Sequence, residues 1–390
     1  MIKDKRFEII CGASLHWDIA LFQRPHQIMS RLDRKHSVLY IRPVDWLTYY
    51  KSPDIRPKEK RFDSPLSNLQ LYSPLILPYS RFFSWIRSLN NSLMTQRIKK
   101  ECRKNAFIRK ILWLYSPFSA YLMGKTEETL VVYDCMDEHA TFKNADPGLV
   151  EAENRLLEKA DIIFAGGKSL YDSKKLKNPN CYLFPSCVDN EHFSKAINAN
   201  IKIPDDLKDI PKPIIGYIGA VDERLDYKLI EALAEKNKNF SFVFVGPIIK
   251  VQKKELPVQK NIFYLGAREY QILPSYLKGF DIGFMPFAMT QVTKMISPTK
   301  TLEYFAAGLR VVSTPIPDVV TDFKGIVRIG HNADEISNHL REILNNKEPD
   351  IIRLGIERAA KNTWDNMVEK MEKIIREKLQ ITNHKSVVSG

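Results

Sequence analysis

The chain has 390 residues and a formal net charge of +13; 44% of its residues are hydrophobic and 27% are charged. This length suits two globular domains, and the composition excludes a disordered or fibrous protein. No run of about 18 apolar residues occurs, so no membrane-spanning helix is expected, and the N-terminal MIKDKRFEIICGA lacks the apolar core of a signal peptide. The five cysteines are scattered without CxxC spacing, which argues against disulfides and a zinc site and favours the cytoplasm.

The first half of the chain alternates apolar runs with helical patterns. Helices are predicted over 24–32 and 149–160, and residues 51–80, rich in proline, serine and charge, are predicted to be an irregular insertion. The predicted strands, each apolar nearly throughout, cover residues 7–12, 37–42, 111–116, 129–135, 161–167 and 181–186. Apolar strands separated by helices indicate a parallel sheet with helices on both faces.

A basic segment rich in aromatic residues lies between residues 81 and 110, with nine lysines and arginines and one acidic residue, Glu101. Its apolar side chains recur at three- and four-residue steps and are Phe82, Trp85, Ile86, Leu89 and Leu93. Such a basic amphipathic helix is typical of membrane surfaces, and a core-packed helix with a solvated basic flank is the alternative. The candidate contacts with an acceptor or with anionic lipid are Arg81, Phe82, Trp85 and Arg87. Nucleic acid is not an expected partner, because no known nucleic-acid motif occurs.

A second alternation follows a linker predicted at 189–212. Its strands are predicted at 213–219, 241–246, 261–266, 281–287, 310–315 and 325–330, with a first helix at 226–237 and a last helix at 363–380. We therefore expect two doubly wound α/β domains, 1–205 and 206–362, then the helix 363–380 and a disordered tail at 381–390. Ligands of such sheets bind beyond the carboxyl ends of the strands, so a cleft between the domains is the expected site.

The stretch SPTKTLEYFAAGLRVVSTP, which begins at Ser297, predicts a short helix directly after a buried strand. Ser297 suits the N-cap, Pro298 suits the first helical position, and Gly308 suits the C-terminal end. The free N–H groups of that helix would form an anion site at the carboxyl end of the strand.

Lys300 and Glu303 lie one turn apart on this predicted helix and face the same way. A lysine in a first turn is unfavourable beside the helix dipole unless it faces an anion. A glutamate can accept two hydrogen bonds from a vicinal diol such as a ribose. The two residues therefore predict a phosphate and a sugar at the helix, and an ordinary surface ion pair is the alternative.

Glycine ends three predicted strands of the second domain, at Gly219, Gly246 and Gly266. One such glycine is commonly turn punctuation, but three at successive strand ends suggest that backbone approaches a ligand closely. None of them belongs to a GxGxxG fingerprint, so a dinucleotide site of that kind is not predicted.

The stretch from Ser297 resembles the nucleotide-binding motif of GT-B glycosyltransferases, in which a Pro-x-Lys and a glutamate precede a small-residue turn and a Val-Val strand. The resemblance extends over most of the chain, including HWDIALFQRPHQIMSRL, VVYDCMDE, PIIGYIGAVDERLDYKLIEALAE and FSFVFVGP. The sequence is especially similar to those of bacterial enzymes that build capsule, exopolysaccharide or teichuronic-type polymers. The implied fold is α/β, with two Rossmann-like domains facing a cleft and the C-terminal helix packing back on the N-terminal domain.

The resemblance also implies an activity. The expected enzyme is a hexosyltransferase that moves a sugar from a nucleotide-sugar donor, with a UDP-sugar favoured, to a lipid-linked or polymer glycan acceptor. GT-B enzymes are generally metal-independent, so no metal or cofactor is expected. The implied location is cytoplasmic and peripheral at the inner membrane face, where the basic helix would meet an anionic membrane surface.

Carried onto this sequence, the motif assigns Glu303 to the ribose hydroxyls of the donor. The other residues that the resemblance assigns to the diphosphate or the base are Lys300, Ser297, Pro298, Thr299, Arg224, Gly219, Ala267 and Arg268. Two positions depart from the family pattern. Met295 stands where many retaining members carry a first glutamate, and Ala220 stands where many carry an arginine after the glycine. The stereochemical outcome therefore stays open.

The first domain is expected to supply the acceptor site and a base. In CGASLHWD, Gly12 would let the loop pass close to a ligand, and His16 is a candidate for contact or proton transfer, as is Asp18. In YDCMDE, one of the carboxylates of Asp134, Asp137 and Glu138 could deprotonate an acceptor hydroxyl, with Asp137 and Glu138 the candidates for the base. A structural histidine and helix capping by Asp137 are the alternatives.

Two other functions remain open from the sequence. A nucleotide-sugar epimerase can share this architecture and would act on a soluble donor without an acceptor. A non-catalytic protein that binds nucleic acid or membranes would not depend on Lys300 or Glu303, and its binding to nucleic acid would fall steeply with salt.

Overall fold

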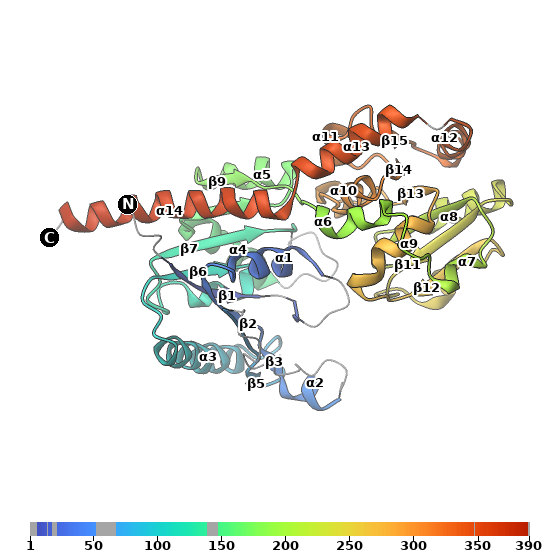
Figure 1. Cartoon of the computed structure of the whole chain (residues 1–390). Helices are drawn as coiled ribbons and strands as arrows, with labels where there is room; N and C mark the ends of the chain where they lie inside the picture. The colour runs from blue at the N-terminus through green and yellow to red at the C-terminus, as the bar shows by residue number, and fades with distance from the viewer. Residues whose placement is uncertain are drawn as a thin grey trace. The chain divides into compact units, whose positions relative to one another are not determined.

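The computed structural model describes residues 6–13, 15–17, 22–51, 68–138, 147–346 and 348–388. The chain forms two compact units, each containing a large parallel sheet (Figure 1). The first unit comprises Met1–Gly166, Leu170–Phe184 and Val368–Gly390, and the second comprises Gly167–Ser169 and Pro185–Met367. The expected α/β class with two Rossmann-like domains is confirmed.

Seven parallel strands form the main sheet of the first unit, in the order β4-β2-β1-β6-β7-β8-β9. They are β1 (Glu8–Gly12), β2 (Ser37–Ile41), β4 (Leu69–Tyr72), β6 (Lys110–Leu114), β7 (Leu130–Cys135), β8 (Ile162–Ala165) and β9 (Cys181–Leu183). Consecutive residues of the central strands, such as Ile9 with Ile10 and Leu112 with Trp113, are all buried. Burial on both faces explains why these strands are apolar throughout instead of alternating.

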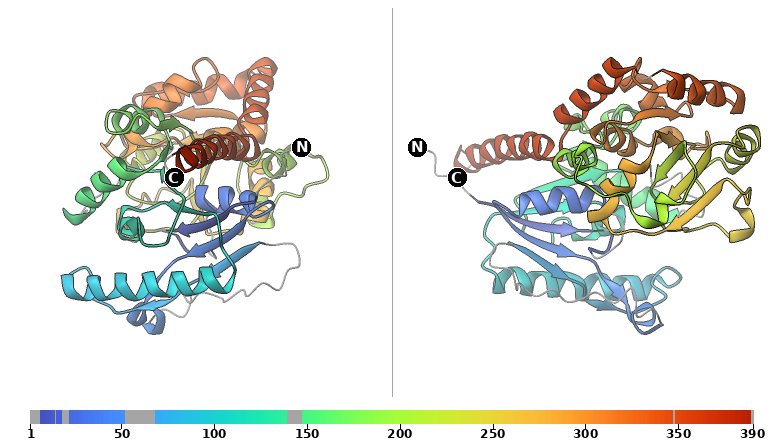
Figure 2. Two further views of the ribbon diagram at one scale, coloured as in Figure 1. Left: turned by 90° about the vertical axis from the view of Figure 1, so that its left-hand side faces the viewer. Right: turned by 45° about the vertical axis from the view of Figure 1, so that its right-hand side comes forward.

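The helices of the first unit cover both faces of its sheet. They are α1 (Arg24–Leu32), α3 (Ser84–Lys104), α4 (Pro147–Lys159), the part of α5 (Lys168–Lys175) that follows Ser169 and the part of α14 (Trp364–Val388) that follows Met367. Figure 2 shows α3 and α14 on opposite sides of the sheet. The C-terminal helix thus packs on the first unit, as the expected fold requires. It continues to Val388, beyond the predicted end at Gln380 and into the tail that was expected to be disordered.

Part of the predicted insertion at 51–80 is regular structure. A small parallel sheet pairs β3 (Val44–Asp45) with β5 (Leu75–Ile76), and α2 (Trp46–Lys51) follows β3 directly. Strand β4, at the edge of the main sheet, also falls within the insertion. These strands are short and only partly buried, so they carry no continuous apolar run that a sequence pattern could report. Residues 52–67 lie outside the described residues.

Six parallel strands form the sheet of the second unit, in the order β12-β11-β10-β13-β14-β15. They are β10 (Ile214–Ile218), β11 (Ser241–Val245), β12 (Ile262–Gly266), β13 (Ile282–Met285), β14 (Arg310–Ser313) and β15 (Arg328–Ile329). The strand order reverses on the two sides of β10. Ligands of open α/β sheets bind at such a switch point, outside the carboxyl ends of the strands.

The longer helices of the second unit alternate with its strands. They are α8 (Tyr227–Lys236), α9 (Leu273–Gly279), α10 (Lys300–Ala306), α11 (Pro317–Asp322), α12 (Ala333–Asn345) and α13 (Pro349–Lys361). Shorter helical turns are η2 in the first unit (Pro117–Leu122), and in the second α6 (Asn190–Phe193), η4 (Ser194–Ile197), α7 (Asp205–Lys208), η5 (Lys253–Glu255), η6 (Tyr270–Ile272) and η7 (Thr293–Met295).

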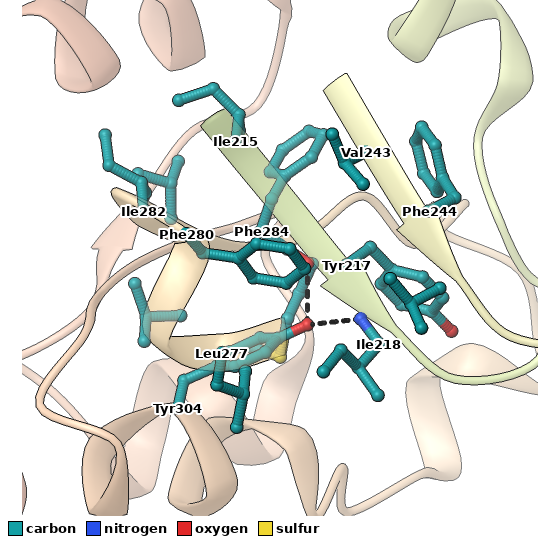
Figure 3. Packing of buried hydrophobic residues seen from close by; sticks show 14 of the residues in the cluster. Ile215, Tyr217, Ile218, Val243, Phe244, Leu277, Phe280, Ile282, Phe284 and Tyr304 are labelled. Atoms are coloured by element: carbon teal, nitrogen blue, oxygen red, sulfur yellow. Dashed lines mark hydrogen bonds between the residues drawn. The ribbon is translucent and has the colours of Figure 1, made fainter. Parts of the chain in front are cut away.

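Aromatic side chains fill much of the core of the second unit (Figure 3). Glycines in its strands leave room for them. A Cβ on Gly216 of β10 would overlap the ring of Phe280, so only glycine fits there while Phe280 is buried at that position. Residues 185–205 also belong to this unit, because Phe193 and Ala196 are part of its core. The predicted boundary at 205/206 therefore lies within the second unit.

Candidate functional site

Helix α10 begins later than the sequence predicts. Thr299 is its N-cap and Lys300 its first residue, so Ser297 is not the cap and Pro298 precedes the helix. The backbone of Thr299 is already helical, with φ −53° and ψ −31°, and its side chain caps no N–H group. The C-terminal end agrees with the prediction: Gly308 has φ +74°, and Gly308 N–H and Leu309 N–H donate to Phe305 and Tyr304 carbonyls. This is the Schellman arrangement, which needs a left-handed residue.

Lys300 and Glu303 are partly buried on α10. Burial lowers the pKa of Lys300, an effect that the nearby Glu303 opposes, and burial raises the pKa of Glu303, which Lys300 opposes in turn. Among the described residues, neither side chain makes a hydrogen bond or an ion pair. Each therefore loses hydration without gaining a hydrogen bond or an ion pair among the described residues.

Lys300 lies directly against the end of strand β10. A Cβ added to Gly219 would overlap Lys300 Cε, and Lys300 Nζ is 5.6 Å from the centroid of the Tyr217 ring. Gly219 has φ +141° and Gly246, at the end of β11, has φ +157°; a Cβ on Gly246 would overlap the Gly219 carbonyl. These two glycines are required by backbone conformation and close packing. The atoms that crowd them belong to the protein, so a close approach to a ligand is not needed to explain these two glycines.

Arg224 is held by Asp222 in the loop after β10. Its Nε and Nη2 lie 3.0 Å and 2.6 Å from the two carboxylate oxygens of Asp222. Asp222 is buried, and both residues affect the pKa of Lys300, so all three charges lie in one neighbourhood. The backbone carbonyl of Arg224 accepts a hydrogen bond from Ala288 N–H, which ties this loop to the segment that leads to α10. Asp222 is the residue that sequence reasoning missed here.

Arg268, predicted beside the base, has its side chain engaged elsewhere. Its Nη2 is 2.6 Å from Asp206 Oδ2 and its Nε is 2.6 Å from Tyr276 Oη. Ala267 is exposed and follows Gly266, whose φ is +75°. The predicted base contact at Ala267 and Arg268 is a backbone contact. Arg268 Nη1 donates to the Ala267 carbonyl at 2.9 Å, so one backbone group of that predicted contact already has a partner.

In the first unit, His16 lies in a loop that His26 of α1 holds in place. Gln23 N–H donates to His26 Nδ1 at 3.1 Å, so Nε2 carries the proton and donates to the His16 carbonyl at 2.9 Å. Burial, and then the charge of Arg42, lowers the pKa of His16 to about 4. His16 is therefore neutral at physiological pH. Asp18 lies outside the described residues.

Gly12 ends β1, and the structure gives it a packing role. A Cβ there would lie 2.8 Å from Leu114 Cδ2 and 3.1 Å from Ser119 Cβ. The close neighbours of Gly12 are thus side chains of β6 and η2, and they account for the glycine without a ligand.

The three carboxylates of YDCMDE have different surroundings. Asp134 is buried and pairs with Arg24, whose Nε is 2.9 Å from Asp134 Oδ1. Glu138 lies 2.7 Å from Lys174 Nζ, and Lys174 in turn lies 3.2 Å from Glu153. Asp137 is partly exposed, and its carboxylate makes no hydrogen bond or ion pair within the ranges that the structure describes. The arrangement places Asp134 and Glu138 in ion pairs and leaves the Asp137 carboxylate without one among the described residues.

Helix α3 presents a different face to the core than the sequence predicts. Its buried row runs in steps of four residues and consists of Ile86, Asn90, Met94, Ile98 and Cys102. The helix begins at Ser84, so Arg81 and Phe82 precede it. The side chains of Phe82 and Trp85 are 74% and 64% exposed, and Arg81 and Arg87 are exposed beside them. Of the predicted apolar stripe only Ile86 is buried, and the rest faces outward.

The ranges that the structure describes contain no group of three or more His, Cys, Asp or Glu side chains arranged to hold a metal ion. None of their helices has both the length and the hydrophobicity needed to cross a bilayer.

Comparison with known proteins identifies the family of the second unit and the fold of the chain. Residues 212–346 match the family described as glycosyl transferases group 1. A putative teichuronic acid biosynthesis glycosyltransferase of Bacillus subtilis (strain 168), TuaH, is 29% identical over 227 residues, which cover 54% of this chain and 56% of that protein. The chain thus matches just over half the length of this curated relative.

Two solved structures resemble nearly the whole chain. Sucrose-phosphate synthase from Thermosynechococcus elongatus superimposes with a TM-score of 0.69 at 13% identity, covering 95% of this chain and 99% of that one. Anabaena HepE (Alr3699), solved in complex with UDP-glucose, gives a TM-score of 0.67 at 10% identity and covers 95% of this chain and 100% of that one. Residues 212–346 are therefore a glycosyl transferases group 1 domain, within a chain that has the GT-B fold of two Rossmann-like domains.

Proposed function

We propose that this protein is a glycosyltransferase that moves a sugar from a nucleotide-sugar donor to a glycan acceptor in bacterial surface polysaccharide synthesis. The observation that carries the proposal is the Lys300–Glu303 pair on α10, at the end of β10, where the two side chains are desolvated and make no hydrogen bond or ion pair within the described residues. The group 1 domain that contains the pair supports it. A UDP-sugar is the favoured donor because HepE, which shares the fold, was solved with UDP-glucose.

In the second unit, Glu303 would accept hydrogen bonds from the ribose hydroxyls of the donor. Lys300 and the backbone N–H groups of Ser297 and Thr299 would bind the diphosphate, because α10 begins there without a side-chain cap. Pro298 has no N–H group and would only shape the backbone between these two donors. Positive charge beside a leaving diphosphate stabilises the negative charge that develops as the glycosidic bond breaks. Arg224 would add to this charge, with Asp222 holding its guanidinium in place. The backbone at Ala267 and Arg268 would meet the base.

In the first unit, Asp137 would act as the base that takes the proton of the acceptor hydroxyl. Glu138 is a poorer candidate, because it pairs with the buried Lys174. His16, neutral at physiological pH, would offer a hydrogen bond to a substrate; with a pKa of about 4 it would accept a proton only weakly.

The acceptor in this proposal is lipid-linked or a polymer glycan, and the protein meets it at an anionic membrane surface on the cytoplasmic side. Support comes from the exposed side chains around the start of α3, a surface we name the aromatic surface: Trp46, Tyr50, Leu75, Leu77, Tyr79, Phe82, Phe83, Trp85, Leu89 and Leu93. Asn90 of α3 bonds the backbone N–H and carbonyl of Leu77, both at 2.9 Å, so helix and turn form one platform.

Charge on this platform matches an anionic partner. Residues 75–100 contain five lysines and arginines and no acidic residue. Tryptophan and tyrosine favour the headgroup region of bilayers, and each lysine or arginine near an anionic surface contributes about 1 kcal/mol. An aromatic surface flanked by cations is therefore suited to peripheral binding to anionic lipid.

The donor half of the proposal is tested by following nucleotide release from UDP- and GDP-sugars, with and without bacterial membrane extract, for the wild type and Glu303→Ala. Release from one donor by the wild type and its loss in the variant are expected. Conversion of a UDP-sugar to its epimer without acceptor would instead identify an epimerase. If no donor releases nucleotide and none protects the protein against heat, a non-catalytic binding protein is the better description.

The membrane half is tested by flotation with vesicles of phosphatidylcholine, with or without phosphatidylglycerol. Retention on anionic vesicles at low salt is expected, and Phe82→Ser with Trp85→Ser should abolish it. The matched control is Leu176→Ser, because Leu176 is 90% exposed and lies outside the aromatic surface. Equal retention of both variants, or no retention of the wild type, would remove the membrane from the proposal while leaving the donor test unaffected.

A further inference from the structure

Strands β10 and β13 pair over only part of their length. Their parallel register joins Ile215 with Ile282 and Gly216 with Gly283, and it stops there although β13 continues to Met285. Alternate residues of β10 direct their backbone groups toward β13, beginning with the Ile214 carbonyl, which accepts from Asp281 N–H at 2.9 Å. By this alternation, Ile218 N–H is a backbone donor that should face β13.

Ile218 N–H binds a side chain instead of a β13 carbonyl. It donates to the hydroxyl of Tyr304 at 3.0 Å, and that hydroxyl donates toward the Phe284 carbonyl at 3.4 Å (Figure 3). Tyr304 comes from α10 and is fully buried. A hydroxyl thus occupies the place of a sheet hydrogen bond and holds the two strands apart at their carboxyl ends.

Gly283 makes this insertion possible. A Cβ at Gly283 would lie 2.6 Å from Cγ and Cδ2 of the Tyr304 ring, too close for any other residue. Gly283 lies in the middle of a buried strand, where glycine is otherwise unfavourable. The glycine and the tyrosine therefore form one device, in which the strand gives up a side chain so that the ring can reach the sheet.

The device connects the two sides of the candidate donor site. Tyr304 is adjacent to Glu303 and one turn beyond Lys300, so its hydroxyl bond sets the position of both along the helix axis. Ile218 directly precedes Gly219, the residue against which the Lys300 side chain lies. A shift of α10 relative to β10 would have to break the bond between Tyr304 and Ile218.

We propose that Tyr304 is a positioning residue of the donor site: its hydroxyl keeps Lys300 and Glu303 in register with the end of β10, so that one side chain meets the diphosphate and the other the ribose. This inference rests on the proposed function. It assigns no chemical step to Tyr304, which does not itself touch the donor.

The test is calorimetric binding of UDP and GDP to the wild type and Tyr304→Phe, together with donor kinetics. Phenylalanine keeps the ring but leaves Ile218 N–H without its partner, so α10 can move. We expect the Kd of the nucleotide and the KM of the donor to rise about tenfold, with a smaller change in kcat. Gly283→Ala, which displaces the ring from the strand side, should give the same pattern.

The matched control is Ser337→Ala. Ser337 is buried in the same unit, and its hydroxyl donates to Asn237 Oδ1 at 2.8 Å, so the variant also loses one buried hydroxyl bond. Thermal unfolding should show comparable losses for the two variants, with nucleotide affinity unchanged in Ser337→Ala. If Tyr304→Phe or Gly283→Ala bound the nucleotide with wild-type affinity, the positioning role of Tyr304 would be wrong, while the proposed function would stand. A wild type that binds neither nucleotide would contradict the proposed function itself.

Discussion

Arg24 and Asp134 form a buried ion pair, with Arg24 Nε 2.9 Å from Asp134 Oδ1 and side chains that are 5% and 0% exposed. Arg24 also donates from Nη1 to the Phe184 carbonyl at 2.7 Å. The pair thus ties the first turn of α1 to the end of β7 and to the residue that follows β9. These contacts hold in place the edge of the sheet where the first unit carries its candidate site residues.

Removal of Asp134 should therefore destabilise the first unit strongly. In Asp134→Ala the guanidinium of Arg24 stays buried without its counter-charge, and we expect a loss of about 3–5 kcal/mol in the free energy of unfolding. Urea denaturation followed by circular dichroism measures this loss. The double variant Arg24→Met/Asp134→Leu should be less destabilised than Asp134→Ala, because no charge is left unpaired. If Asp134→Ala lost less than about 1 kcal/mol in the free energy of unfolding, the pair would behave like a solvent-exposed ion pair, which contradicts the strong destabilisation expected here.

Gly219→Ala should damage nucleotide binding more than stability. The new Cβ would occupy the space of Lys300 Cε and force the lysine out of its position. Gly325→Ala is the control, since Gly325 has φ +80° but no atom within 4 Å of an added Cβ. Gly325→Ala should lose about 1–2 kcal/mol from backbone strain, and Gly219→Ala somewhat more, because φ +141° lies in a region that essentially only glycine adopts. In isothermal titration calorimetry with UDP, only Gly219→Ala should bind more weakly than the wild type. Equal affinity of the two variants for UDP would show that Lys300 does not bind the phosphates.

The adjacent carboxylates Asp137 and Glu138 should respond in opposite ways. Asp137→Asn is expected to lower kcat by about 100-fold or more, because a general base contributes about that factor, while the melting temperature stays unchanged. Glu138→Gln is expected to lower the melting temperature, because Lys174 loses its partner at 2.7 Å, with a smaller effect on kcat. Turnover and thermal unfolding of both variants check this assignment. A larger kcat loss in Glu138→Gln would move the base to Glu138.

Stability should fall on acidification through the contact between α14 and the first unit. Burial lowers the pKa of His36, an effect that Glu372 only partly opposes, so below about pH 6.5 the unfolded chain binds a proton that the folded protein resists. The pKa of Glu372 is also lowered: burial opposes the shift, and a hydrogen bond from Arg376 and the charges of His36, Lys35 and Arg376 outweigh it. A depressed carboxylate stabilises above its unfolded pKa and loses that effect as pH falls, so both groups act in the same direction.

Urea denaturation at several pH values between 8 and about 5 measures this trend. The free energy of unfolding should decrease as pH falls through the window just below about 6.5. His36→Gln removes one of the titrating groups and should reduce the slope in that window without abolishing it, because the pKa values of His16 and His192 are also lowered by burial. An unchanged slope in His36→Gln would assign the effect to other histidines.

The local sequence pattern was sufficient to predict the α/β class, most strand positions, the placement of Lys300 and Glu303 on one helix, and the end of that helix at Gly308. Buried parallel strands have continuous apolar runs and a helix repeats every 3.6 residues, so these features are encoded within short segments. The start of α10 was misplaced by two residues, because Ser297 and Pro298 have good capping chemistry but the backbone becomes helical only at Thr299.

Only the tertiary structure decided which charged residues are available for chemistry. Asp134, Asp137 and Glu138 are three carboxylates within five residues, yet Arg24 pairs with the first, Lys174 pairs with the third, and no described residue pairs with the second. Arg24 is 110 positions from its partner, and Ile218 is 86 positions from the hydroxyl of Tyr304. Sequence periodicity reports which side of an element is buried, whereas a partner so distant along the chain is set by strand order and helix packing.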